Sequence, residues 1–180
     1  ARIVDDVLDV SRARQQRVLS LGEQVVLDPA VQALAEEWVR QTQRKGVLIA
    51  LDAADAEVRF DVEHLRRLLV NLLDNAARYA SSRAGAIQVV TTTQRGSAGR
   101  PSLQVWSDGA PLEPAVQRHL FEPFFSSESR SSGLGLFLCR ELCRRHGATI
   151  GYERRALSPG GPEGNEFFVN FAASENRLTQ

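Results

Sequence analysis

The sequence predicts an α/β two-layer sandwich, a mixed and mostly antiparallel sheet with helices on one face, plus an N-terminal helix fragment. Segments with apolar residues at helical spacing alternate with short runs rich in Val, Ile and Phe. The runs at 86–93 ("AIQVVTTT") and 102–107 ("SLQVWS") are joined by "QRGSAGRP", whose glycines and proline are typical of a hairpin loop. A chain of 180 residues that is 43% hydrophobic can bury one domain, with a short appendage.

The first segment, residues 1–20, has the pattern of a helix that packs on another helix. Apolar residues recur at Ile3, Val7 and Val10, Val4 and Leu8 widen the stripe, and Arg12, Arg14 and Arg17 lie outside it. No partner for this stripe is evident in the chain. The chain has no Met and starts abruptly, so we expect an excised fragment.

The next segment combines a short strand with a helix. After Gly22, "VVL" leads to Asp28 and Pro29, which we expect to be the N-cap and the first position of a helix. That helix carries "AVQALAEEWVRQTQRKG", and we expect Gly46 to end it.

Two further strands precede the longest helix. Residues 47–51 ("VLIAL") are interpreted as a buried strand, and 58–60 ("VRF") as another. Asp61 is expected to cap a helix over 62–80.

The second half of the chain contains a long irregular stretch and then regular elements. From Asp108 to Ser132 we expect a loop with a short helix at 113–120. A helix follows ("GLGLFLCRELCRRHG"), which Gly147 ends. Strands "ATIGYER" and "NEFFVNF" complete the sheet, and the last residues are expected to be frayed.

The composition excludes several classes of function. Lys plus Arg and Asp plus Glu number 22 each, so no positive field attracts nucleic acid. The apolar runs are far shorter than a membrane span and no signal-peptide pattern opens the chain, so we expect a soluble domain. Cys139 and Cys143 share one helix face, which favours core packing over a metal or redox role.

The helix over 62–80 has two distinct faces. Its predicted core stripe consists of Leu65, Leu68, Leu69, Leu72, Leu73 and Ala76, and an adjoining polar edge consists of Asn71, Asn75, Arg78 and Tyr79. Two solvated amides are one interpretation of that edge. The other is a metal-and-phosphate site, because an amide oxygen is a hard neutral ligand for Mg²⁺ and an arginine can bind phosphate.

A glycine-rich stretch is the second candidate. In "SSGLGLFLCRELC", Ser131, Ser132, Gly133 and Gly135 start a helix whose N-terminal N–H groups can approach phosphate. Such glycines also often only close a turn. The preceding loop carries Phe121, Phe124 and Phe125, and it is either a lid or a loop that these rings pin to the core.

Taken together, the motifs resemble the catalytic ATP-binding domain of sensor histidine kinases, a member of the GHKL ATPase superfamily with gyrase B and MutL. "NLLDNAARYA" is similar to the N box, "SDGAPL" to the first glycine box, "LFEPFF" to the F box, "SSGLGL" to the second glycine box, and "GPEGNEFFVNF" to the closing glycine-strand segment. They follow the order of the family over about residues 60–171. The wording around "FEPFFSSESRSSGLGL" is most similar to nitrogen-regulatory and type IV pilus sensor kinases.

The resemblance implies ATP and Mg²⁺ as cofactors and assigns roles to the candidate residues. Asn75 would bind Mg²⁺ and be the catalytic residue, Asn71 would support it, Arg78 would contact phosphate, and Tyr79 would wall the adenine pocket. Ser107, Gly109 and Phe125 would also contact the nucleotide. Ser132, Gly133, Leu134, Gly135 and Leu136 would meet the triphosphate, and residues 109–131 would form the ATP lid.

The resemblance also implies partners and domain bounds. Residues 1–20 would be the end of the second helix of a dimerisation and histidine-phosphotransfer domain, 21–173 the catalytic domain, and 174–180 a tail. None of His64, His119 and His146 lies in an H-E-x-x-N-P-like motif, so the accepting histidine would lie upstream, in the same chain or its dimer mate. A response regulator would be the next partner. The domain would be cytoplasmic, its parent a homodimer anchored to the inner membrane, and this fragment mainly monomeric.

Three positions depart from the family. Ser107 stands where the first glycine box has an Asp that accepts from adenine, and Pro111 stands at its second glycine. Asp108 is a poor substitute, because a shift of one residue in a strand points a side chain to the opposite face. Ser131 also stands where the family often has Gly. Two hypotheses follow: a working kinase catalytic domain, or a degenerate one that acts as a regulatory or protein-interaction module.

Overall fold

The computed structural model describes residues 2–15, 23–94, 99–125 and 133–172, with the side chains of the first helix described for residues 4–11. The helices are α1 (Arg2–Gln15), α2 (Leu27–Thr42), α3 (Val62–Tyr79), α4 (Pro114–Arg118) and α5 (Gly135–Arg145). The strands are β1 (Gln24–Val26), β2 (Val47–Asp52), β3 (Glu57–Arg59), β4 (Ile87–Thr92), β5 (Ser102–Ser107), β6 (Thr149–Ala156) and β7 (Glu163–Asn170). The expected tail at 174–180 lies outside the described residues.

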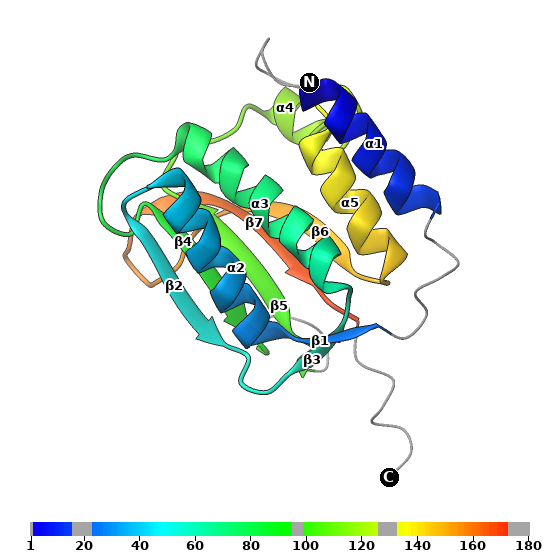
Figure 1. Ribbon diagram of the computed structural model, residues 1–180. Coiled ribbons are helices and arrows are strands. Elements are labelled where there is room, and N and C mark those ends of the chain that lie inside the picture. Colours follow the sequence, from blue (N-terminus) through cyan, green and yellow to red (C-terminus); the bar gives the residue numbers. More distant parts are fainter. Residues whose placement is uncertain (1, 16–22, 95–98, 126–132, 173–180) are drawn as a thin grey trace.

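The described strands form a five-stranded sheet in the order β2-β4-β5-β7-β6, and β1 pairs with β3 in a small separate sheet. Only the β2–β4 pairing in the large sheet is parallel, since α3 crosses over between these strands; the other pairings are antiparallel. Helices α2, α3 and α5 lie side by side over one face of the sheet (Figure 1). The predicted two-layer α/β sandwich with a mixed, mostly antiparallel sheet is confirmed.

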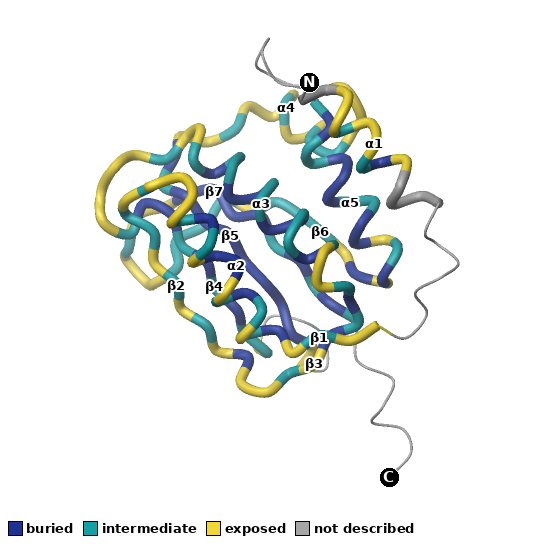
Figure 2. The backbone as a smooth tube through the Cα atoms, in the orientation of Figure 1, coloured by how far each residue is buried: buried dark blue, intermediate teal, exposed yellow. Residues whose placement is uncertain are grey.

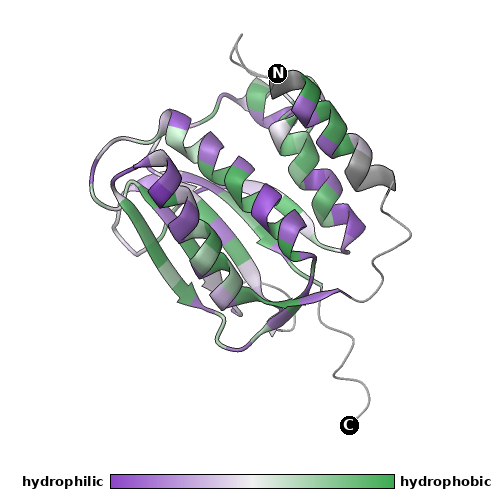
Figure 3. Cartoon of the chain, viewed as in Figure 1, coloured by the Kyte–Doolittle hydropathy of each residue, from purple (hydrophilic) through white to green (hydrophobic). Residues whose placement is uncertain are grey.

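Helix α3 lies at the centre of the helical layer and carries the predicted core stripe. All six of its stripe residues, Leu65, Leu68, Leu69, Leu72, Leu73 and Ala76, are buried. The carboxylate of Asp61 accepts a hydrogen bond from the His64 N–H at 2.9 Å, as the capping prediction requires. The alternation of apolar and polar residues along the helices is visible in Figure 3.

The start and end of α2 differ from the prediction. Asp28 does not cap the helix, because Val26 holds the N-cap position and α2 begins at Leu27. The Asp28 carboxylate instead accepts from the Ala53 N–H at 2.9 Å and from the Thr91 hydroxyl at 2.7 Å. At the other end the left-handed residue is Gln43, three positions before the expected Gly46.

Strand β2 was expected to be buried and is instead the edge strand of the sheet. Its residues alternate between partial burial and exposure, and Leu48 is 51% exposed. Strand β5, at the centre of the sheet, is buried along its whole length (Figure 2). Local sequence could not distinguish them, because both runs are rich in apolar residues and only the strand order decides which one is covered.

Helix α1 packs against α5 (Figure 1), so the stripe has one partner that the sequence did not reveal. Val10 is buried in this contact, and Asp9 forms an ion pair with Arg67 of α3. Among the described side chains of the predicted stripe only Val10 is buried, and Val4, Val7 and Leu8 remain exposed.

Two titratable groups in α5 are buried and serve the core. Cys139 and Cys143 are buried free thiols, and burial raises both pKa values, that of Cys143 to about 12. Core packing is thus confirmed for them.

His146 is the residue at the C-terminal end of α5, and its side chain is buried. Burial lowers its pKa to about 4, and nearby His64 and Arg145 add to that effect. Its Nε2 atom lies 2.8 Å from Nδ1 of His64. The buried imidazole is therefore neutral near pH 7.

Within the part of the chain that the structure describes, no helix is both long and apolar enough to cross a membrane.

Candidate functional site

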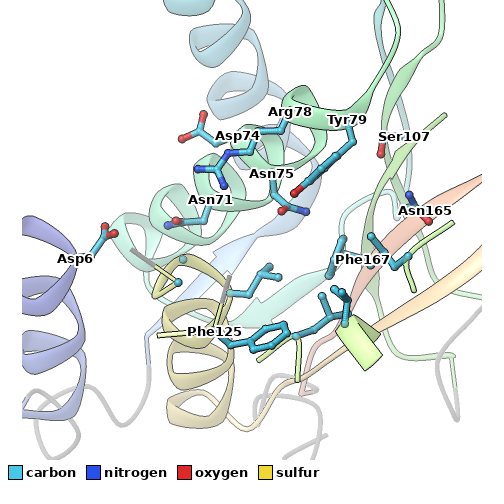
Figure 4. Close-up of a pocket in the computed structure, with 16 residues that line it drawn as sticks. Asp6, Asn71, Asp74, Asn75, Arg78, Tyr79, Ser107, Phe125, Asn165 and Phe167 are labelled. Atoms are coloured by element: carbon cyan, nitrogen blue, oxygen red, sulfur yellow. The ribbon is translucent and has the colours of Figure 1, made fainter. Parts of the chain in front are cut away.

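A cleft lies between α3, the start of α5, the segment around α4, and strands β5 and β7 (Figure 4); its volume is about 980 Å³ when the adjoining open solvent is included. Most predicted site residues line it: Asn71, Asn75, Arg78, Tyr79, Ser107, Phe125, Gly133, Gly135 and Leu136. Ser132 lies outside the described residues. Gly109 and Leu134 are adjacent to the cleft in sequence but do not line it.

The polar edge of α3 forms one wall. Asn71 and Asn75 are four residues apart, so both amides reach the same cleft. The amide nitrogen of Asn71 donates to the Arg67 carbonyl at 2.7 Å, which fixes the direction of its oxygen. Asp74 also lines the cleft, and its carboxylate accepts from the Trp38 indole N–H at 3.0 Å.

The start of α5 forms the second wall. Gly133 has a left-handed φ of +71°, and a Cβ there would lie 2.5 Å from the Phe124 carbonyl carbon, so only glycine fits. A Cβ on Gly135 would lie 3.0 Å from the Asn71 amide oxygen. Leu134 directs a buried side chain into the core, which leaves its backbone as the part that can face a ligand. Because Gly135 has no side chain, the positive N-terminal end of α5 lies close to the Asn71 amide.

The floor of the cleft is made by two neutral side chains, Ser107 and Asn165, on paired strands. The Asn165 oxygen accepts from the Tyr152 hydroxyl at 2.6 Å and from Arg154 at 3.3 Å, and its nitrogen donates to the Ala110 carbonyl at 2.8 Å.

The turn that follows Ser107 is held from outside the cleft. Arg154 donates to the Gly109 carbonyl at 2.6 Å. Asp108 accepts from the Ser81 N–H at 2.8 Å and does not line the cleft, as its position in the strand predicts.

The segment around α4 supplies an apolar wall. Leu112, Val116 and Leu120 line the cleft, as does Phe125. Phe121 packs against the core, with its ring centroid 6.3 Å from that of Phe167, whereas Phe124 is 70% exposed. Phe121 is thus the ring that pins this segment, and Phe125 is the one that faces the cleft.

Sequence reasoning missed Asp6, Asp74, Leu112, Val116, Leu120, Asn165 and Phe167. Two signals could have revealed part of this set. Asn165 and Phe167 alternate on one face of a strand, and Leu112, Val116 and Leu120 repeat every four residues. Asp6 has no such signal, because α1 reaches the cleft only through its tertiary packing.

The residues present fit Mg²⁺ at one end of the cleft. Asn71 and Asn75 offer amide oxygens there, and Mg²⁺ takes oxygen ligands while completing its shell from water and substrate phosphates. Arg78 and the start of α5 add positive charge for phosphate. The other end offers Tyr79, Phe167 and Leu112, which suit a flat apolar ring. Fold and cleft together define a two-layer α/β domain whose cleft has a polar end with oxygen ligands and an apolar end.

The sequence model of the family described as histidine kinase-, DNA gyrase B- and HSP90-like ATPases matches residues 60–174. The chain belongs to this family, and the resemblance to the catalytic domains of sensor histidine kinases is confirmed. The sensor protein kinase PilS of Pseudomonas aeruginosa is 34% identical over 160 residues, covering 88% of this chain and 29% of PilS. The chain thus spans under a third of that relative.

Solved structures share the fold. The mycobacterial sensor histidine kinase MprB superposes with a TM-score of 0.67 at 22% identity, covering 84% of this chain and 98% of that one. Full-length ShkA in complex with AMPPNP has a TM-score of 0.67 at 23% identity, covering 96% of this chain and 36% of that one.

Proposed function

We propose that this chain binds Mg·ATP in the cleft and donates the γ-phosphate to a histidine outside this sequence. The observation that carries the proposal is the convergence of Asn71, Asn75 and Arg78 with the glycine-rich start of α5 on one cleft. The family of ATPases to which the chain belongs supports it, as does the similarity of the fold to that of ShkA, whose structure is a complex with AMPPNP.

In this proposal the phosphate end works mainly by positioning and charge neutralisation. Asn75 would hold Mg²⁺, with Asn71 beside it. Mg²⁺ would neutralise charge on the phosphates during transfer. Arg78 would contact phosphate oxygens, and the absence of a side chain on Gly135, beside Asn71, would keep the start of α5 open to the triphosphate.

The base end would hold adenine between Tyr79 and the apolar wall of Leu112 and Phe167. Ser107 and Asn165 would supply neutral hydrogen-bonding groups at the floor, in place of a carboxylate. A neutral contact is weaker than a charge-assisted one, so we expect recognition of the base to suffer more than recognition of the phosphates.

The proposal also includes the neighbouring domain, the parent chain and the next protein in the phosphate transfer. Residues 1–20 would be the end of the second helix of a dimerisation and histidine-phosphotransfer domain, and the parent chain would be a homodimer anchored in the inner membrane with this domain in the cytoplasm. The phosphate would then pass to a response regulator. The names of relatives such as PilS support this assignment.

A degenerate kinase-like domain with a regulatory or binding role is the second candidate. Ser107 at the base-recognition position favours it, as does Pro111, whose fixed φ stiffens the start of the lid.

Calorimetric titrations of the chain with ATP, one in the presence of Mg²⁺ and one in the presence of EDTA, separate the two candidate functions. The proposal expects saturable Mg²⁺-dependent binding that Asn75→Ala and Asn75→Asp abolish without changing the melting temperature, because this amide edges the core without filling it. Asn170→Ala, on β7 and outside the cleft, is the matched control and should bind as the parent does. A parent chain that binds no nucleotide would favour the degenerate domain. Unchanged affinity in a folded Asn75 variant would remove Asn75 from the site.

A further inference from the structure

We infer that Asp6 of α1 makes nucleotide binding in the cleft depend more strongly on Mg²⁺, and thereby couples the occupancy of the cleft to the docking of α1. The inference rests on the proposed function and adds to it a selectivity residue and a regulatory link. It starts from the cleft itself, since Asp6 lines it although it comes from a helix remote in sequence.

The position of Asp6 is at the phosphate end. Figure 4 shows its carboxylate extending from α1 toward the side of the cleft where Asn71 lies. Asp74 lines the same cleft from α3, but its carboxylate accepts from the Trp38 indole N–H, so Asp6 is the carboxylate that extends toward the Asn71 side (Figure 4). Neither Asp6 nor Asp74 is part of the glycine-rich start of α5, which would meet the phosphates.

The docking of α1 is connected directly to this end of the cleft. Val10 is buried where α1 packs, and Asp9 forms an ion pair with Arg67. The carbonyl of that same Arg67 accepts from the Asn71 amide at 2.7 Å. One residue of α3 therefore contacts the docked helix through its side chain and an amide of the cleft through its backbone carbonyl, which places the docked α1 beside the Asn71 end of the cleft.

The sign of the effect follows from charge. Free ATP carries about two more negative charges than Mg·ATP, so a carboxylate at the phosphate end repels the free form more strongly and attracts the metal of the complex. Binding linkage is reciprocal: if docked α1 favours the Mg²⁺ form of the nucleotide, the Mg²⁺ form favours docked α1.

The test measures the ratio of the Kd of AMPPNP in EDTA to its Kd in Mg²⁺, using the whole 180-residue chain. Asp6→Asn should lower this ratio about two- to fivefold, the size typical of one partly exposed charge. Asp5→Asn makes the same charge change on an exposed neighbour in the same helix and should leave the ratio unchanged. The difference between the variants should shrink at high salt.

A second arm tests the coupling. Asp9→Asn removes the ion pair with Arg67, so Asp6→Asn should change the ratio less in that background than in the parent. An equal change in both backgrounds would overturn the coupling to docking. Circular dichroism checks folding, and Asp6→Ser serves if Asp6→Asn misfolds.

The outcomes separate the two claims. If the parent binds AMPPNP in neither condition, the proposed function fails and the inference with it. If the parent binds and Asp6→Asn behaves as Asp5→Asn does, the inference alone fails.

Discussion

Ser107 of β5 and Asn165 of β7 are directly paired across the sheet, and both are almost fully buried at the floor of the cleft, with 4% and 5% of their surface exposed. Asn165 is held in place by Tyr152, Arg154 and the Ala110 carbonyl. Among the described residues, this floor of the cleft is therefore held in place and polar, and it is formed by neutral side chains.

Ser107→Asp should tighten ATP binding by up to about tenfold, or roughly 1.4 kcal/mol, because a carboxylate accepts more strongly from the adenine amine than a hydroxyl does. Discrimination of ATP from GTP, poor in the parent, should improve in the same variant. Calorimetry with both nucleotides measures these changes, and Ser158→Asp on the exposed β6–β7 loop is the charge control.

Unchanged or weaker ATP affinity in folded Ser107→Asp protein would contradict this prediction. A titration with ADP then shows whether another group holds the adenine or the pocket binds neither nucleotide.

Gly135→Ala should weaken nucleotide binding without lowering the melting temperature. Its Cβ would lie 3.0 Å from the Asn71 amide oxygen, so Asn71 must move at the phosphate end. Alanine is the better helix former by up to about 1 kcal/mol, which favours the fold of the variant. Thermal melting and calorimetry on the same sample measure both effects, and a variant that binds as the parent does would place the triphosphate away from α5.

His146 should make the protein less stable as the pH falls from 6.5 toward 4. Its pKa is lowered from 6.5 to about 4 in the folded state, so the unfolded chain binds more protons in this window. The stabilisation is complete above pH 6.5 and is lost progressively on acidification, by at most about 3 kcal/mol. Urea unfolding across this range should show a shallower pH dependence in His146→Leu, whatever its absolute stability.

Two comparisons make that measurement specific. His119→Gln is the matched control, since it replaces an exposed histidine whose ring contacts Glu122 and not the core. Burial also lowers the pKa of His64, so His64 should account for the pH dependence of stability that remains when His146 is replaced. Identical slopes in His146→Leu and parent would show that His146 does not titrate in this window.

The fragment should sediment mainly as a monomer. The exposed apolar residues of α1, Val4, Val7 and Leu8, form a single short stripe, too small to bury the roughly 1,200 Å² that a stable interface needs. Sedimentation velocity over a wide concentration range checks this, and a dimer that persists on dilution would contradict it. Val7→Asp would then show whether α1 forms the contact.

The site was largely predictable where it depends on helical spacing. Asn71, Asn75, Arg78 and Tyr79 follow from the geometry of one helix, and α3 presents them to the cleft as that spacing requires. The central strand at 102–107 also matched its predicted bounds, since turn residues flank it on both sides.

The remaining differences depend on contacts between elements distant in sequence. Asp28 looked like a helix cap, but its carboxylate binds Ala53 and Thr91, which only the folded sheet brings near. The exposure of Leu48 follows from strand order, and the entry of Asp6 into the cleft follows from the docking of α1. No local pattern encodes these relationships.

The burial of Cys139 and Cys143 has a practical consequence for following α1. Because the thiolate is the reactive form and burial raises both thiol pKa values, a maleimide dye should leave these two residues unlabelled in the folded protein. A cysteine introduced at exposed Ser11 would then carry the fluorophore at one defined point on α1. The native chain is in this respect already a suitable background for fluorescence measurements of helix movement.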